Sequence, residues 1–141
     1  MACNLSGQYM HAIDDKNRVF VPAKHREQLG ESFMITHLVD KCLSVYSMEE
    51  WEKLTEKISA LPQVKARDVL RFVFASAVEV QPDKQGRVVI PQELREYAQL
   101  EKNVVFIGAA KHAEIWSDVN WAEKQRELEA TMLDTLIDLG F

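Results

Sequence analysis

Apolar and polar residues alternate in two short segments of the chain that are nearly copies of one another. Residues 14–22 are DDKNRVFVP and residues 83–91 are DKQGRVVIP, an offset of 69 residues. In the first copy the alternation places Val19 and Val21 on one face of a strand and Phe20 on the other. A nine-residue pattern that occurs once in each half indicates an internal duplication.

A tight turn precedes the strand in both copies. An acidic residue and two polar residues lead to Asn17 or Gly86, and these two residue types tolerate a positive φ. Arg18 and Arg87 then begin the strands. With a first strand over residues 8–13, the pattern predicts an exposed hairpin in each half, with an Asp-Arg pair at its tip.

A proline ends each of these strands and suits the first turn of a helix. The sequence predicts a short helix over residues 23–29, closed by Gly30. Ser47 to Glu50 has the Ser-x-x-Glu pattern of a capping box and opens a helix that ends before Pro62. A further helical turn is expected over residues 65–70.

Several apolar runs with strand-like composition complete the prediction. The expected strands cover residues 33–36, 42–46, 72–80 and 104–107, and residues 115–117 repeat the pattern of residues 45–47. A longer helix is predicted over residues 118–139, because apolar residues recur there at spacings of four, four and three: Leu128, Met132, Leu136 and Leu139. This apolar stripe needs a partner surface, within the chain or across subunits.

The net charge of −5 lies entirely in the C-terminal part of the chain. Residues 1–113 contain 15 Lys and Arg against 15 Asp and Glu, whereas residues 114–141 contain 2 against 7. Around the first turn, basic side chains outnumber the two acidic ones: Lys16, Arg18, Lys24 and Arg26. A basic surface therefore remains available for a nucleic acid if the acidic tail is held away from it.

The sequence predicts a soluble, cytoplasmic protein. At 141 residues and 47% hydrophobic content, the chain suits one domain or two small halves that share a core. No segment approaches twenty apolar residues, and the N-terminus lacks a basic region followed by an apolar run. Cys3 and Cys42 fit no disulfide framework or paired metal spacing, so we expect reduced thiols. Phosphate loops, dinucleotide fingerprints and nucleophile elbows are absent from the sequence.

These motifs resemble those of the MraZ family of bacterial transcriptional regulators, whose halves are similar to the swapped-hairpin DNA-binding domain of AbrB-type proteins. The resemblance lies in the two D-x-x-x-R turns with their following V-x-[VI]-P, and it extends to DKCLSVYSMEEWEKL at 40–54, ALPQVKARDVLRFVF at 60–74 and EIWSDVNW at 114–121. Asn17 departs from the glycine usual in this family, and His37 and His112 stand where the family often has arginine.

The resemblance implies an α+β fold with a β-rich core, in which two tandem repeats, residues 1–69 and 70–141, form a swapped-hairpin β-barrel with peripheral helices and an acidic C-terminal helix over about 118–139. It also implies a ring-like homo-oligomer, associated with the nucleoid, that binds double-stranded DNA repeats upstream of the cell-division and cell-wall gene cluster. A regulator of this kind needs no cofactor, and no membrane, small-molecule substrate or enzymatic activity is expected. The family's D-x-x-x-R residues correspond here to Asp14 and Arg18 and to Asp83 and Arg87, which are the predicted DNA-binding residues.

The chemistry of these residue types suits DNA contact. Arginine donates two parallel hydrogen bonds to guanine or phosphate, and a neighbouring carboxylate holds its guanidinium in one orientation. Lysine is a point charge better suited to phosphate. The predicted phosphate contacts are Lys16 and Lys84, with Lys24, Arg26 and Arg95 as further candidates on or near the short helices.

Three other interpretations of the motifs remain open. An Asp-Arg pair across a turn is commonly a surface staple worth under about 1 kcal/mol, and one repeat could bind bases while the other only completes the fold. The acidic helix with its apolar stripe could make the protein an antitoxin-like interaction module. A small hydrolase is the third hypothesis, and it requires the carboxylates of Asp14 and Asp83 to share one pocket.

Overall fold

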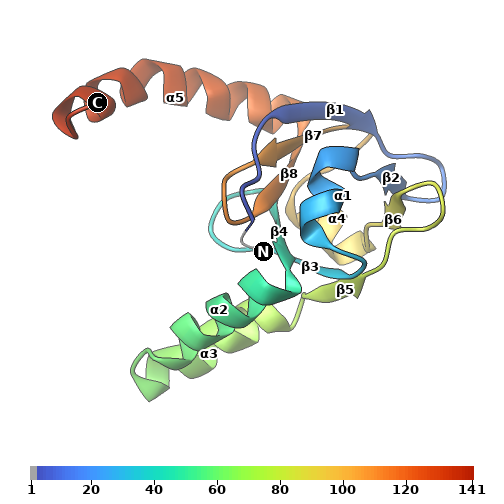
Figure 1. Ribbon diagram of the computed structural model, residues 1–141, viewed down its shortest axis with the longest axis horizontal. Helices are drawn as coiled ribbons and strands as arrows, with labels where there is room; N and C mark the ends of the chain where they lie inside the picture. Colours follow the sequence, from blue (N-terminus) through green and yellow to red (C-terminus); the bar gives the residue numbers. More distant parts are fainter. Residues whose placement is uncertain (1–2) are drawn as a thin grey trace.

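The computed structural model describes residues 3–141 as an α+β fold in which antiparallel strands form the body and helices project from it (Figure 1). The strands of the described chain are β1 (Gln8–Ala12), β2 (Arg18–Phe20), β3 (Phe33–Thr36), β4 (Leu43–Ser47), β5 (Val78–Val80), β6 (Arg87–Val89), β7 (Asn103–Gly108) and β8 (Ala113–Ser117). Its helices are α1 (Ala23–Leu29), α2 (Met48–Ser59), α3 (Gln63–Phe74), α4 (Gln92–Tyr97) and α5 (Asp118–Asp138).

The strands form two antiparallel sheets in which the repeats alternate. The larger sheet has the order β1-β7-β8-β4-β3-β5, and the smaller is the pair β2-β6. If each strand is replaced by its counterpart in the other repeat, the order of the larger sheet is the same read backwards. The same strands therefore remain neighbours in both sheets. The registers obey the same rule, because Val19 lies opposite Val88 and Ser44 lies opposite Glu114. A pseudo-twofold axis therefore passes between β2 and β6 and between β4 and β8.

The predicted hairpins are not hairpins within one repeat. The first turn forms as expected, with Asn17 at a φ of 62° and its N–H donating to the carbonyl of Asp14. Beyond the turn the strands diverge: β1 pairs with β7, and β2 pairs with β6. The expected barrel is not observed either, because among the described residues the ladders remain an open six-stranded sheet and a separate two-stranded one.

The main core lies between the large sheet, the β2-β6 pair and the short helices. Apolar residues from both repeats meet in it, and the largest of its fully buried side chains are Phe33, Phe106, Ile35, Leu43, Ile90 and Leu94. Because each repeat supplies half of every layer, this main core belongs to both repeats. Burial of the inner faces of β2 and β6 fixes which side chains of those strands face solvent.

A second apolar cluster joins α2 to α3, and it corrects the prediction of a strand over residues 72–80. Helix α3 continues to Phe74, and only Val78–Val80 form a strand. Ala66 and Val73 are buried on one helical face, and Val73 packs in a cluster with Trp51 and Ile58 of α2. Tertiary packing of this face overrides the strand preference of a Phe- and Val-rich run.

Helices α2 and α5 begin in the same way. The hydroxyl of Ser47 accepts a hydrogen bond from the Glu50 N–H, and the hydroxyl of Ser117 accepts one from the Asn120 N–H. In Figure 1 the α2-α3 pair and α5 diverge at one end of the molecule, and β2 and β6 lie at the other. None of the helices in the described part of the chain is both long and apolar enough to span a membrane.

Candidate nucleic-acid interface

The outward face of the β2-β6 ribbon brings the two predicted arginines together. Val19 and Val88 point into the core, so their neighbours on each strand point out. Arg18 lies opposite Val89, and Arg87 lies opposite Phe20. The two arginines are thus diagonal neighbours on one face, a relation that places residues about 7–8 Å apart.

The carboxylate of Asp14 organises the first turn and its arginine together. Oδ1 accepts hydrogen bonds from the backbone N–H groups of Lys16 and Arg18, both at 2.9 Å. Oδ2 accepts one from Nε of Arg18 at 2.8 Å. One side chain therefore fixes the turn and the direction of the guanidinium.

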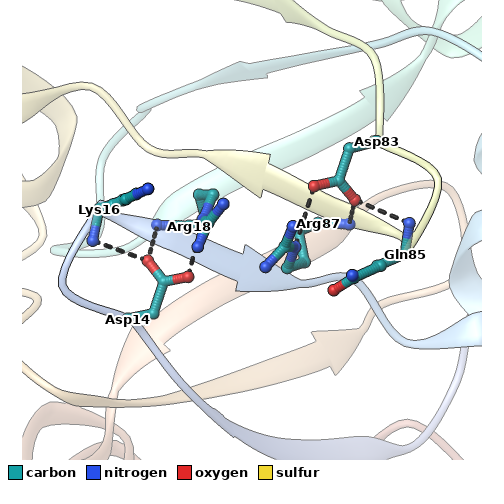
Figure 2. Close-up of polar contacts among 6 residues, drawn as sticks. All are labelled: Asp14, Lys16, Arg18, Asp83, Gln85 and Arg87. Carbon is teal, nitrogen blue, oxygen red and sulfur yellow. Dashed lines mark hydrogen bonds and ion pairs between the residues drawn. The ribbon is translucent and has the colours of Figure 1, made fainter.

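The second repeat reproduces this arrangement atom for atom (Figure 2). Oδ1 of Asp83 accepts from the backbone N–H groups of Gln85 and Arg87 at 2.9 Å, and Oδ2 accepts from Nε of Arg87 at 2.9 Å. Because both carboxylates engage Nε, neither bond uses the two terminal nitrogens of its guanidinium. Those nitrogens form the edge that binds guanine or phosphate in a bidentate manner.

The turns hold both carboxyl groups in the ionised state. The backbone hydrogen bond from Arg18, supported by its side chain and by the Lys16 N–H, holds the pKa of Asp14 below its ordinary value. The pKa of Asp83 is lowered in the same way by Arg87 and Gln85. Each arginine is therefore paired with a charged carboxylate throughout the neutral range.

The ribbon face is partly accessible and partly apolar. The side chains of Arg18 and Arg87 are 28% and 19% exposed, less than hairpin tips would give. Phe20 and Val89 are 44% and 54% exposed, which is high for large apolar side chains. The guanidinium carbon of Arg87 lies 6.0 Å from the centroid of the Phe20 ring, at the outer limit of a cation–π contact.

The predicted phosphate contacts occupy two different environments. Lys16 and Lys84 are exposed on the turns, and Lys24 is exposed on α1. Arg26 and Arg95 instead each donate a hydrogen bond from Nε to a backbone carbonyl at the end of the preceding strand, those of Val21 at 3.0 Å and Ile90 at 2.9 Å.

Arg26 and Arg95 thus brace the strand-to-helix junctions, a role that the sequence did not indicate. Arg26 also packs against the opposite turn, because a Cβ at Gly86 would lie 2.7 Å from its Cζ. Gly86 has a φ of 85°, so this turn requires a residue that accepts the left-handed region.

Comparison with known proteins assigns the chain to a family. The family model described as "MraZ protein, putative antitoxin-like" matches residues 5–72 and again residues 73–136. The chain belongs to the MraZ family.

Several relatives carry the name Transcriptional regulator MraZ. The protein from Desulfitobacterium hafniense is 48% identical over 139 residues, which is 95% of this chain and 97% of the relative. The protein from Caldanaerobacter subterraneus is 50% identical over 129 residues, or 90% of each chain. The one from Caldicellulosiruptor saccharolyticus is 52% identical over 126 residues, covering 88% of this chain and 86% of the relative.

MraZ transcriptional regulators are not enzymes, and this removes the hydrolase hypothesis. The geometry supplies a physical reason in this MraZ chain. Asp14 and Asp83 lie at opposite ends of the ribbon, and each carboxylate is engaged by its own turn (Figure 2). They do not form the acid-base pair that general acid-base catalysis would need.

The apolar members of the ribbon face and the bonds between the repeats were not assigned a role from the sequence. Phe20 was predicted to face away from Val19, and this alternation was the available signal. No sequence signal indicated the hydrogen bonds between the repeats. In these bonds the Val21 N–H donates to the carbonyl of Gly86, and the Ile90 N–H donates to the carbonyl of Asn17.

Proposed function

We propose that this MraZ chain is a sequence-specific DNA-binding transcriptional regulator and that its β2-β6 ribbon enters the major groove. The observation that carries the proposal is the pair of guanidinium groups on the outward face of one two-stranded ribbon, each oriented by its own carboxylate. The major groove is about 12 Å wide and admits such a ribbon.

Arg18 and Arg87 are the base-contacting residues of this proposal. Each can donate two hydrogen bonds to O6 and N7 of a guanine, and the bond to Asp14 or Asp83 reduces the entropy lost on binding. The pseudo-twofold axis between β2 and β6 relates the two arginines. We therefore expect two guanines in related positions on the two DNA strands.

Phe20 and Val89 occupy the other two positions of the same face, each opposite an arginine, and add an apolar element to it. A thymine methyl group is the apolar feature that the major groove presents. The ribbon thus suits a short site in which guanines and thymines are neighbours.

The lysines supply contacts that do not depend on sequence. Lys16 and Lys84 extend from the turns at the two ends of the ribbon, and Lys24 stands on α1. Arg26 and Arg95 remain weaker candidates for phosphate, because Nε of each is already bonded to the backbone. The acidic helix α5 projects from the end of the molecule opposite the ribbon (Figure 1), so it would not face DNA bound at the ribbon.

One ribbon offers few contacts, so we propose that the protein acts as a ring-like homo-oligomer. Several ribbons on one ring can engage successive DNA repeats, and their individually weak contacts then add to a useful affinity. The proposed target is DNA upstream of the cell-division and cell-wall gene cluster. The protein would act in the cytoplasm, at the nucleoid, without a cofactor, and residues 1–69 and 70–141 are its proposed repeats.

The experiment that tests this proposal measures DNA affinity as a function of salt for the wild type, Arg18→Ala, Arg87→Ala and Lys16→Ala. The probes are a duplex selected by the wild type from a random library and the same duplex scrambled. We expect each arginine variant to lose about 1–3 kcal/mol of discrimination between the two duplexes.

Lys16→Ala is the matched control, since its side chain is on the same turn but carries no planar fork. We expect it to bind both duplexes more weakly and to reduce the salt slope by about one. If Arg18→Ala lost equal affinity for both duplexes, Arg18 would be a backbone clamp and not a base contact.

The antitoxin-like hypothesis is favoured by one observation, the exposed apolar residues of α5. A protein that acts only as an interaction module would bind selected and scrambled duplexes equally. The same titration therefore separates the two functions.

A further inference from the structure

The β2-β6 ribbon has two ends, and each end combines the turn of one repeat with the helix of the other (Figure 2). The Val21 N–H donates to the carbonyl of Gly86 at 2.9 Å, which places the second turn beside the start of α1. The Ile90 N–H donates to the carbonyl of Asn17 at 3.0 Å, which places the first turn beside the start of α4. We call these the α1 end and the α4 end of the ribbon.

The pseudo-twofold axis relates the two ends, but their charges differ. At the α1 end, Lys84 on the turn and Lys24 on the helix are both exposed. Asp15 and Glu93 occupy the equivalent positions at the α4 end, and they are also exposed. Lys16 adds one positive charge there, and its counterpart at the α1 end is neutral. The α1 end thus carries two positive charges, whereas the α4 end carries two negative charges and one positive charge.

Other nearby charges do not reverse this difference. The arginine and the glutamate that follow on each helix are matched between α1 and α4. Behind the turns, Glu31 lies after α1, and Glu101 and Lys102 lie before β7. They add one negative charge behind the α1 end and none behind the α4 end, so the α1 end remains the more positive. Glu79 on β5 lines a hollow with both ribbon arginines and belongs to neither end.

Local contacts hold these charges in place. The hydroxyl of Ser76 donates to Oε1 of Glu93 at 2.8 Å, which fixes this carboxylate at the start of α4. At the other end, the guanidinium of Arg26 packs closely against Gly86 and joins α1 to the second turn. Lys24 and Lys84 are therefore carried on one continuous surface.

We propose that the α1 end is the main anchor of this protein on the DNA backbone, so that each ribbon holds its site from one side. Arg87 begins β6 at this end, and Lys24 and Lys84 then contact the phosphates beside its base. Phosphates at the α4 end approach Asp15 and Glu93, which repel them. The inference rests on the proposed function and names the backbone contacts of the same site.

The pseudo-symmetric ribbon therefore makes an asymmetric complex. Lys16 provides the single lysine contact at the α4 end, next to the base contacted by Arg18. Each phosphate contact adds about 0.9 to the slope of log affinity against log salt concentration. Most of this slope should come from the flank of the site that adjoins the base contacted by Arg87.

Neutral methylphosphonate linkages in the selected duplex test the anchor directly. Base substitution first identifies the guanine of each arginine, because replacing it weakens the wild type but not the variant that lacks that arginine. Two linkages are then neutralised on the flank beside the Arg87 guanine, or on the flank beside the Arg18 guanine. We expect the first change to weaken binding of the wild type at least about fivefold more than the second.

A double variant tests the two lysines. Lys24→Ala with Lys84→Ala should lower the salt slope by about two and remove the difference between the flanks. The matched control is Lys57→Ala with Lys65→Ala, which removes two exposed lysines from α2 and α3, away from the ribbon (Figure 1). It should leave the slope and the flank difference unchanged. All four lysines are exposed, so circular dichroism should show an unchanged fold.

The opposite change makes the α4 end more like the α1 end. Asp15→Lys places at the exposed position of the first turn the residue type that the second turn carries. We expect the salt slope to rise by about one and the difference between the flanks to decrease.

Equal losses from the two flanks in the wild type, or a larger loss beside the Arg18 guanine, would overturn the proposal. An unchanged slope in the Lys24→Ala, Lys84→Ala variant would also overturn it. If the selected duplex is still preferred to the scrambled one in an arginine-dependent manner, only the anchor is wrong. If the wild type shows no preference, the proposed function fails, and the anchor fails with it.

Discussion

Asp14 and Asp83 do two things at once, and this explains why the same residue type begins both turns. Oδ1 of each accepts two backbone N–H groups, and Oδ2 accepts the arginine Nε. The surface-staple interpretation is therefore part of the DNA-binding proposal and not a rival to it. The staple fixes the guanidinium on which the proposed base recognition depends.

The titration of Asp14 tests this arrangement. The pKa of Asp14 is lower in the folded protein than its ordinary value of 3.8. The ionised carboxylate therefore stabilises the folded turn at every pH above 3.8, and this stabilisation is lost as the pH falls through the lower pKa of the folded state. We expect carboxyl NMR to show a midpoint below 3.8. In Arg18→Ala the midpoint should rise only part of the way, because the backbone hydrogen bonds are the largest cause and remain.

A midpoint at or above 3.8 in the wild type would show that the turn does not hold the carboxylate. Asp83 provides an internal comparison, because Arg87 and Gln85 lower its pKa by the same contacts. In the wild type the two titration midpoints should both lie below the ordinary value. In Arg18→Ala only the midpoint of Asp14 should rise, and that of Asp83 should stay where it was.

Sequence reasoning found the charged residues of the ribbon but not all of their roles. The turn chemistry identified Asp14 and Arg18 because their spacing is local. It did not separate Arg26 from the lysines, since the bond from Arg26 to the Val21 carbonyl depends on how α1 meets β2. The assignment of Arg26 and of the lysines as DNA contacts remains a prediction.

At the level of elements, local signals were reliable where the partners are close in sequence. The Ser47 cap and the start of α2 follow from a capping box, and α5 follows from its apolar spacing. The predicted strand over residues 72–80 was wrong, because composition does not show that Val73 faces Trp51 across an interhelical contact.

The α2-α3 pair should depend on that contact. Ile58 is buried where α2 meets α3, so Ile58→Ala should lower the free energy of unfolding by about 2–5 kcal/mol. Urea denaturation measures this loss. Val39→Ala, at a fully exposed position, should stay within about 0.5 kcal/mol of the wild type.

Equal stabilities of the Ile58→Ala and Val39→Ala variants would mean that the α2-α3 pair is not packed as described. A loss confined to hydrogen-exchange protection of α2 and α3, with the body unchanged, would mean that this pair unfolds separately from the sheet.

At the scale of the whole molecule, the repeats are interlocked, and the sequence could not show it. A turn that joins two strands has the same local chemistry whether the strands pair with each other or with another repeat. Here β1 pairs with β7, β2 with β6 and β4 with β8. The duplication was visible, but the exchange of strands depends on contacts across the whole chain.

Interlocking predicts that the first repeat alone is not a folded monomer. A fragment of residues 1–72 lacks the partners of β1 and β2 and one of the two partners of β4, since β3 remains and β8 is lost. Two such fragments can replace them, because the pseudo-twofold axis makes the repeats equivalent. Sedimentation with circular dichroism should therefore find an unfolded monomer or a folded dimer. A folded monomer with cooperative unfolding would contradict the topology.

The central claim is that the outward face of β2 and β6 touches DNA bases. The most direct measurement is photocrosslinking to a selected duplex from a photoreactive amino acid at Val89, which faces outward beside Arg18, with Val39 as the control position. The account predicts base crosslinks from position 89 that scrambled competitor does not remove, and none from position 39. Absence of crosslinks at position 89 while the protein remains bound to the duplex would contradict it.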